Sequence, residues 1–197
     1  MPSPATSPFA TAVSRRSGEL GEAREAIDAD GKWVLPGGID SHVHIAQPSG
    51  EGIVMADDFE SATRSAIIGG NTTVLPFCLQ EKGTSLRGSV EAYHAKAEGR
   101  CYTDVSFHLI ISDPTSQVLG QELSALVRYG YTSFKVFMAH EGLALNDRQM
   151  LEVMVVARET RALVMVHGEN YDIIRFLTDQ FETEGKMAPG SMLPPAR

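Results

Sequence analysis

The sequence predicts an α/β fold in which a parallel sheet is built from about five strand–helix units. From Glu25 onward, short apolar segments alternate with segments of helical spacing, the pattern of parallel strands joined by crossover helices. The segments FHLII and ALVMV have no polar face, as expected of strands buried in a parallel sheet. Three apolar segments carry metal-binding side chains at or near their ends: His42, His44, Lys135 and His167.

These side chains decide between two architectures. An open, doubly wound sheet also fits the alternation, but no glycine-rich phosphate loop follows the first strand. In a (β/α)8 barrel, the active site collects at the carboxyl ends of the strands. We therefore predict a partial (β/α)8 TIM barrel. A complete barrel of this type needs about 250 residues, more than the 197 present.

Caps and breakers set the boundaries of the elements. Pro36-Gly37-Gly38 interrupts the apolar run of residues 33–45, and the first strand follows this break. A helix is expected at 58–68, between candidate caps at Asp57-Asp58 and a stop at Gly69-Gly70. The later strands are expected at 73–77, 105–111, 133–138 and 163–167. The later helices are expected at 86–99, 117–129, about 146–161 and 173–183.

Local signals support three of the later boundaries. Asp113-Pro114 ends the third strand, and Gly130 ends the helix that follows it. Asn146 and Gln149 have the spacing of a capping box, in which each side chain bonds the other residue's main chain. A helix is therefore expected to begin at Asn146.

Residues 1–24 differ in composition from the rest of the chain. They are rich in Ser, Pro, Ala and Thr and contain no acidic residue before Glu19. With Arg15 and Arg16 they faintly resemble an organelle-targeting segment, but we expect a disordered tail. Residues 25–197 are expected to form one incomplete barrel domain.

The charge balance and the cysteines exclude several classes of protein. A net charge of −8 and a pI near 5.2 argue against a nucleic-acid partner, which requires a clustered basic face. No apolar run approaches the length of a membrane span. We expect a cytoplasmic enzyme with two reduced thiols, since Cys78 and Cys101 have no metal-type spacing.

His42 and His44 form the first candidate pair of metal ligands. Residues two apart in a strand project to one face, so both imidazoles can reach one ion. Asp40 shares that face and is expected to hold an imidazole in one tautomer. Two polar residues at a strand end, without metal, remain the alternative.

Lys135 is unusual because it lies inside an apolar strand, where a charged ammonium is unfavourable. The side chain can extend to the surface, act as a base or nucleophile, or react with carbon dioxide to form a metal-bridging carbamate. The upstream His pair and the strand-end His167 favour the carbamate. His94 is expected to be solvated, and His108 to be a hydrogen-bonded core residue.

Several segments in order resemble one enzyme family. IDADGKWVLPGGIDSHVHI, DDFESATRSAIIGGNTTVLPF, SFKVFMAH and LVMVHGEN resemble the dihydropyrimidinase and hydantoinase branch of the amidohydrolase superfamily. FCLQEKGTSLRGSVEAYHAKA and FHLIISDPT are also similar to this branch, especially to its bacterial hydantoinases. The resemblance covers residues 26–187.

The resemblance implies a barrel with two divalent metal ions, expected to be zinc. His42 and His44 would bind one ion, His167 the second, and carboxylated Lys135 would bridge both. The implied substrate is a small cyclic amide or imide. Water activated by the metals would open a dihydropyrimidine or hydantoin to an N-carbamoyl amino acid, a reaction type of pyrimidine catabolism.

The chain departs from the family pattern in three places. The family supplies a histidine from strand six and an aspartate from strand eight, both beyond the span of this chain. His140 stands where the family has a tyrosine that donates to the developing oxyanion. Of the family's small β-sandwich, only residues near 26–35 correspond. We expect open edges at the first and fifth strands, and pairing with another copy or a complementing fragment.

Other functions stay open at this point. A non-catalytic relative used for assembly, such as a collapsin response mediator protein, and an inactive truncated fragment are both alternatives. The four metal-binding side chains favour an enzyme lineage, because the assembly relatives generally lack them. Within the enzymes, allantoinase and dihydroorotase are the near alternatives, and residues 80–86 and 113–115 favour the hydantoinase branch.

Overall fold

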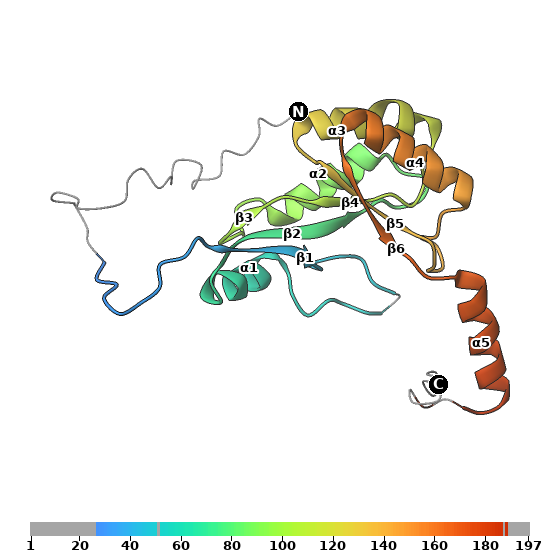
Figure 1. Ribbon diagram of the computed structural model, residues 1–197, viewed down its shortest axis with the longest axis horizontal. Coiled ribbons are helices and arrows are strands. Elements are labelled where there is room, and N and C mark those ends of the chain that lie inside the picture. The colour runs from blue at the N-terminus through green and yellow to red at the C-terminus, as the bar shows by residue number, and fades with distance from the viewer. Residues whose placement is uncertain (1–26, 51, 187, 189–197) are drawn as a thin grey trace.

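Strands and helices alternate along the described part of the chain, which in this computed structural model comprises residues 27–50, 52–186 and 188. Figure 1 shows their arrangement. The strands are β1 (Gly38–Val43), β2 (Asn71–Leu79), β3 (Asp104–Val105), β4 (His108–Ile110), β5 (Ser133–Phe137) and β6 (Leu163–His167). The helices are α1 (Phe59–Ile68), α2 (Leu86–Ala97), the π-helix η1 (Val118–Glu122), α3 (Leu123–Tyr129), α4 (Asp147–Thr160) and α5 (Tyr171–Thr183).

All strand pairs are parallel, in the order β1-β2-β4-β5-β6, and β3 pairs with the first half of β2. Because neighbouring strands are parallel, each crossover returns the chain to the same end of the sheet. The strands also follow one another in space as they do in sequence, as in a (β/α)8 barrel. The carboxyl ends of the five main strands therefore lie at one edge. The predicted parallel α/β sheet is confirmed.

The predicted caps of two helices are also confirmed. Asp58 accepts from the Ser61 main-chain N–H at 2.9 Å, and the Ser61 hydroxyl accepts from the Asp58 N–H, which completes a capping box on α1. Asn146 and Gln149 make the same reciprocal pair on α4. These bonds satisfy donors that the first helical turn otherwise leaves without partners.

Two expected elements are interrupted. The strand expected at 105–111 is divided into β3, which pairs with Thr73 and Val74, and β4, which pairs with the end of β2. The helix expected at 117–129 begins as the π-helix η1, where the buried Glu122 accepts from the Ser85 hydroxyl at 3.0 Å. Its second oxygen accepts from the Arg87 N–H at 3.1 Å, so the first turn of this helix holds the start of α2.

Helices α1 to α4 cover one face of the sheet, and α2, α3 and α4 lie together in Figure 1. Alternate strand residues, among them Leu109, Phe134 and Val136, are fully buried between the sheet and these helices. Burial of this apolar area is the main contribution to the stability of the fold. The opposite face holds a smaller apolar cluster of Phe77 and Ile110 with Phe137.

The two edges of the sheet are exposed, as predicted for the first and fifth strands. Ile39 in β1 is largely exposed, and Leu163 in β6 is 63% exposed. The prediction that ALVMV is buried on both faces is therefore wrong, whereas FHLII is buried throughout. The reason is position: β4 has a neighbour on each side, while β6 is an edge and α5 extends away from it (Figure 1).

The segment before β1 contains a turn and no strand among its described residues 27–37. Trp33 and Leu35 are largely exposed there, so the expected sandwich fragment is an extended arm. The tail predicted at residues 1–24 lies outside the described residues. Within the described ranges, no helix combines the length and apolar character needed to cross a membrane. Cys78 and Cys101 are free thiols, as expected.

Candidate metal centre

Side chains of β5 point alternately to the helix-covered face and to the open face of the sheet. Phe134 and Val136 are buried against the helices, whereas Lys135 and Phe137 project to the open face. Phe137 pairs with His167 at the carboxyl end of β6. Lys135 and His167 therefore reach the same face at the same edge of the sheet, as the sequence predicts.

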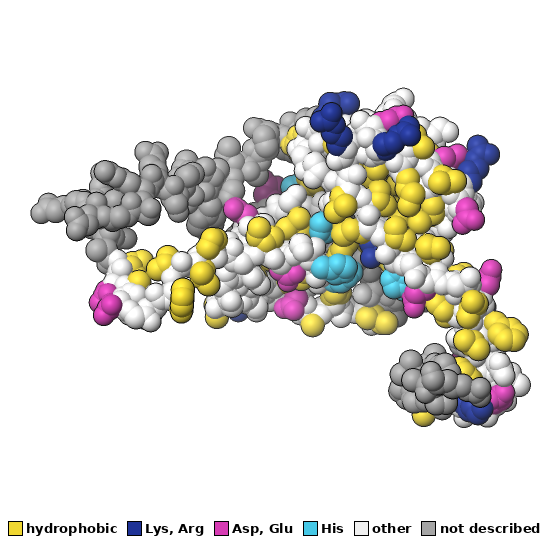
Figure 2. All heavy atoms as spheres, viewed as in Figure 1, with side chains coloured by type: hydrophobic (Ala, Val, Ile, Leu, Met, Phe, Trp, Pro, Cys, Tyr) yellow, Lys and Arg dark blue, Asp and Glu magenta, His cyan; other side chains and the backbone are white. Residues whose placement is uncertain are grey.

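Two aromatic rings connect the four predicted ligands. His42 and His44 both pack on Phe77, with ring centroids 4.6 and 4.9 Å from its centroid. The Lys135 ammonium lies 5.9 Å from the Phe77 ring and 5.3 Å from that of Phe137. On the other side, the His167 ring stacks on Phe137 at 5.4 Å. Histidine side chains are grouped near the middle of the molecule in Figure 2.

The half-buried Lys135 does not extend freely into solvent. Its ammonium lies within reach of two aromatic faces, which attract a cation. Partial desolvation lowers the pKa of His42, and the positive charge of Lys135 lowers it further. Both effects favour the neutral imidazole, whose nitrogen lone pair is the form that binds a metal.

Gln47 orients the second histidine. The Nδ1 of His44 lies 2.5 Å from the Oε1 of Gln47, so Nδ1 carries the hydrogen and Nε2 keeps its lone pair. From α2, Tyr93 and Lys96 donate to the carbonyls of Ile45 and Ala46, directly after His44. The main chain that follows His44 is thus held against α2.

Asp40 acts differently from the expectation. Its carboxylate accepts from the main-chain N–H of His42 at 3.1 Å instead of holding an imidazole. The reason is a bulge in β1: three steps from Asp40 to Val43 oppose two steps in β2, which turns the His42 N–H toward the Asp40 side chain. Asp40 therefore stabilises the bulge.

Glu169 is the partner of His167, and no specific signal in the sequence predicted this pairing. Its carboxylate bonds the Nε2 of His167. When Nε2 donates to Glu169, Nδ1 is the nitrogen that remains for a metal. His167 is the last residue of β6 and Glu169 lies two residues later in the loop, so the loop conformation brings the two side chains together.

His140 lies on the loop after β5, with its ring centroid 5.9 Å from that of Phe137. Its φ of 114° is a conformation that residues other than glycine rarely adopt. Its carbonyl accepts from the N–H groups of Leu143 and Ala144, which fixes the turn. His140 is exposed at the mouth of the candidate site, and its predicted role toward an oxyanion stays a prediction.

Residues 33–186 match the family model described as the amidohydrolase family. The chain belongs to this family. It is 44% identical over 179 residues to a D-hydantoinase of Streptomyces coelicolor, covering 90% of this chain and 38% of the relative. A dihydropyrimidinase of Rattus norvegicus is 34% identical, over 80% of this chain and 30% of the relative.

Solved structures give the same assignment of fold for this amidohydrolase. A D-hydantoinase structure superimposes with a TM-score of 0.85 at 43% identity, over 90% of this chain and 39% of that chain. The parallel sheet with its helices matches part of the barrel of such structures, which confirms the predicted partial TIM barrel. The chain thus spans under two fifths of the relatives described here.

Members of the amidohydrolase family generally bind divalent metals, and the donors of this chain fit such ions. Two imidazoles adjoin one ring, and a lysine lies between them and a third imidazole. Within the ranges that the structure describes, no three His, Cys, Asp or Glu side chains gather as one metal-binding group. The predicted division of these side chains between two ions, with the lysine shared, stays a prediction.

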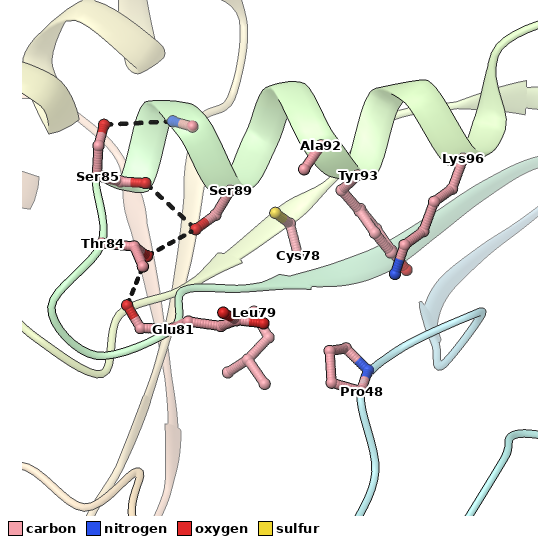
Figure 3. A pocket seen from close by; sticks show the side chains of 11 residues that line it. Pro48, Cys78, Leu79, Glu81, Thr84, Ser85, Ser89, Ala92, Tyr93 and Lys96 are labelled. Atoms are coloured by element: carbon pink, nitrogen blue, oxygen red, sulfur yellow. Dashed lines mark hydrogen bonds between the residues drawn. The ribbon is translucent and has the colours of Figure 1, made fainter.

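A pocket of about 240 Å³ lies apart from these ligands (Figure 3). It is formed between α2 and the carboxyl end of β2, with Ser85, Ser89 and Lys96 on its helix side. Cys78 lines it as well, and burial raises the pKa of this thiol to about 12. The thiol is therefore protonated and unreactive, and we assign no chemistry to the pocket.

Proposed function

We propose that this chain carries part of the active site of a metal-dependent hydrolase that opens small cyclic amides or imides, as D-hydantoinases and dihydropyrimidinases do. One observation carries the proposal: His42, Lys135 and His167 meet on one face, around Phe77 and Phe137, at the carboxyl edge of the sheet. Similarity to D-hydantoinases over 90% of the chain supports the substrate class.

In this proposal His42 and His44 would hold one divalent ion, expected to be Zn²⁺, and His167 would hold a second. Carboxylated Lys135 would be shared by both, because the carbamate replaces a cation by an anion with two oxygen donors. When bound, such ions supply an activated water and polarise the amide carbonyl.

The side chains around the ligands keep the site in order. Gln47 and Glu169 each bond one ring nitrogen of His44 and His167, so the other ring nitrogen would remain for metal binding. Phe77 and Phe137 limit the access of water to Lys135. We propose that His140 donates a hydrogen bond to the carbonyl oxygen of the substrate ring as charge develops there, the role that the family gives to a tyrosine. Its ring contact with Phe137 on the loop after β5 supports this role.

Metal content of the full 197-residue chain tests this proposal first. We expect the chain to retain Zn²⁺ after gel filtration, and His42→Ala and Lys135→Ala to lose it. His94→Ala is the matched control, because this histidine lies on α2, bonded to Tyr131 and away from the ligands. A folded wild-type chain that retains no divalent metal would contradict the proposal.

Two further measurements refine the assignment. Intact mass under neutral, non-denaturing conditions should show one added carbon dioxide that Lys135→Ala lacks. Hydrolysis of dihydrouracil and hydantoin should be assayed with the same samples. Turnover by the wild-type chain would show that ligands from later strands are dispensable, whereas metal binding without turnover would show that this span binds but does not complete the site.

We further propose that the chain associates through its open edges, with another copy or with a complementing fragment. Ile39 in β1 and Leu163 in β6 expose apolar area at the two edges of the described sheet, where each strand pairs with one neighbour in that sheet. Sedimentation at several concentrations tests this, and a concentration-independent monomer would contradict pairing between copies.

A further inference from the structure

His108 is a buried polar residue directly beneath the candidate ligands. It lies on β4 and is only 5% exposed, yet both of its ring nitrogens are bonded. Nε2 lies 2.8 Å from the carbonyl oxygen of Ser41 in β1. Nδ1 lies 2.5 Å from the hydroxyl of Ser133 in β5. One imidazole thus connects two strands that are not neighbours in the sheet.

The chemistry of the two partners fixes the polarity of this connection. A carbonyl only accepts, so Nε2 of His108 must carry the hydrogen and donate to Ser41. In the neutral ring Nδ1 is then an acceptor, and the Ser133 hydroxyl donates to it. Both bonds are therefore made by a single tautomer. We call this connection, from Ser41 through His108 to Ser133, the His108 strap.

The bulge in β1 explains why the Ser41 carbonyl needs this donor. Between Asp40 and Val43 the regular pairing with β2 is interrupted. Pro76, the residue opposite Val43, has no N–H to donate. The bond to the Ser41 carbonyl is partly buried, and a carbonyl that loses water without gaining a donor is unfavourable by the desolvation of its oxygen. The Nε2–H of His108 supplies the donor at this point.

The ends of the His108 strap adjoin the candidate ligands. Ser41 directly precedes His42, and Ser133 lies two residues before Lys135 on the same face of β5. The His108 ring also lies 5.0 Å from the Phe77 ring, on which His42 packs. A substitution at His108 can therefore shift His42 in two ways, through the main chain at Ser41 and through the Phe77 ring.

We propose that His108 is a positioning residue that holds the bulge bearing His42 at a fixed distance from the strand bearing Lys135, and thereby raises the affinity of the site for divalent metal. The inference rests on the proposed function, because it assumes that these side chains share a metal centre. It assigns to a core histidine an effect on binding that is separable from its effect on stability.

Competition between the full chain and a chromophoric chelator for Zn²⁺ measures this affinity. We expect His108→Leu to bind Zn²⁺ about 10- to 100-fold more weakly than wild type, the range found for residues that orient ligands. His108→Gln keeps an amide donor for the Ser41 carbonyl, and we expect it to recover most of the affinity. Ser133→Ala removes the other end of the strap and should give an intermediate loss.

Ile111→Val is the matched control for stability. Ile111 follows β4, is fully buried and packs on the helix-covered face, away from the strap. It should lower the urea midpoint without changing Zn²⁺ affinity. Unchanged affinity in His108→Leu, with a lowered urea midpoint like that of the control, would overturn the inference and leave the proposed function intact.

Hydrogen exchange of the metal-free chain separates the two proposals completely. We expect His108→Leu to accelerate exchange in residues 38–43 relative to residues 71–79, and Ile111→Val to leave this ratio unchanged. A wild-type chain that binds no Zn²⁺ would refute the proposed function and the effect on affinity together. Equal exchange ratios in wild type and His108→Leu would refute the strap itself.

Discussion

The helix-covered face and the open face of the sheet are built from alternate residues of the same strands, yet they differ in content. On the covered face, Leu109, Phe134 and Val136 are fully buried among apolar side chains of four helices. On the open face, the neighbouring positions hold His108 and Lys135. Adjacent residues of β5 therefore differ in role: one packs in the core, and the next is a candidate metal ligand.

This difference teaches where stability and function can be changed independently. Apolar burial stabilises a fold in proportion to the area removed from water, and most of that area lies on the covered face. On the open face, the buried apolar cluster of the described residues consists of Phe77, Ile110 and Phe137. We expect substitutions on the covered face to change the free energy of unfolding, and those on the open face to change metal binding.

Phe134→Ala should have the largest effect on stability. The side chain is fully buried in the covered face, and truncating such a phenylalanine costs about 3–5 kcal/mol. Urea unfolding followed by far-UV circular dichroism measures the loss. A decrease below about 1 kcal/mol would show that the covered face can collapse around the missing ring and is less closely packed than described.

Lys135→Met, one residue further along β5, should have the opposite effect, changing metal affinity strongly and stability little. We expect Zn²⁺ affinity to fall by about 100-fold or more, because the ligand itself is lost and not only its orientation. The free energy of unfolding should change by less than about 1 kcal/mol, since a methionine fits beside the two phenylalanine rings. Exposed Lys82→Met is the control and should change neither quantity. Equal metal binding by both variants would remove Lys135 from the site.

His94 should make the covered face sensitive to pH. Burial lowers the pKa of His94, whose Nε2 bonds the Tyr131 hydroxyl and whose ring contacts Phe107. The unfolded chain, with an ordinary histidine pKa near 6.5, takes up a proton first as pH falls. Stability is therefore lost from about pH 7 downward until the folded state is protonated as well.

The matched variant for this effect is His94→Gln, which has no titrating group. Urea midpoints at pH 8 and pH 5.5 should differ less in His94→Gln than in wild type. His42, whose pKa is also lowered, remains in both chains and cancels in the comparison. The same pH difference in both proteins would mean that His94 does not contribute to it.

Local pattern was sufficient to predict much of this fold. Caps at Asp58 and Asn146 marked two helix starts because capping depends on residues three apart. Lys135 stood out because a lysine within an apolar strand needs a reason. The break near Ser106 and the partners of His108 were not predictable, because they depend on strands distant in the sequence.

The error at β6 has the same origin and leads to the smallest predicted effect. An apolar stretch of five residues has the same sequence pattern in a central strand and in an edge strand. Which strands lie beside it depends on the tertiary structure. Leu163 is 63% exposed, so Leu163→Ala should change the free energy of unfolding of the dilute chain by at most about 0.5 kcal/mol.

The dependence of the Leu163→Ala penalty on chain concentration tests whether the β6 edge pairs with another copy. If β6 pairs with another copy, unfolding is linked to dissociation and the penalty of Leu163→Ala grows as the chain is concentrated. Val164→Ala, on the side of β6 that packs on the covered core, should be destabilising at every concentration. A Leu163→Ala penalty that stays small at all concentrations would exclude β6 from any pairing between copies, and would leave β1 as the edge to examine.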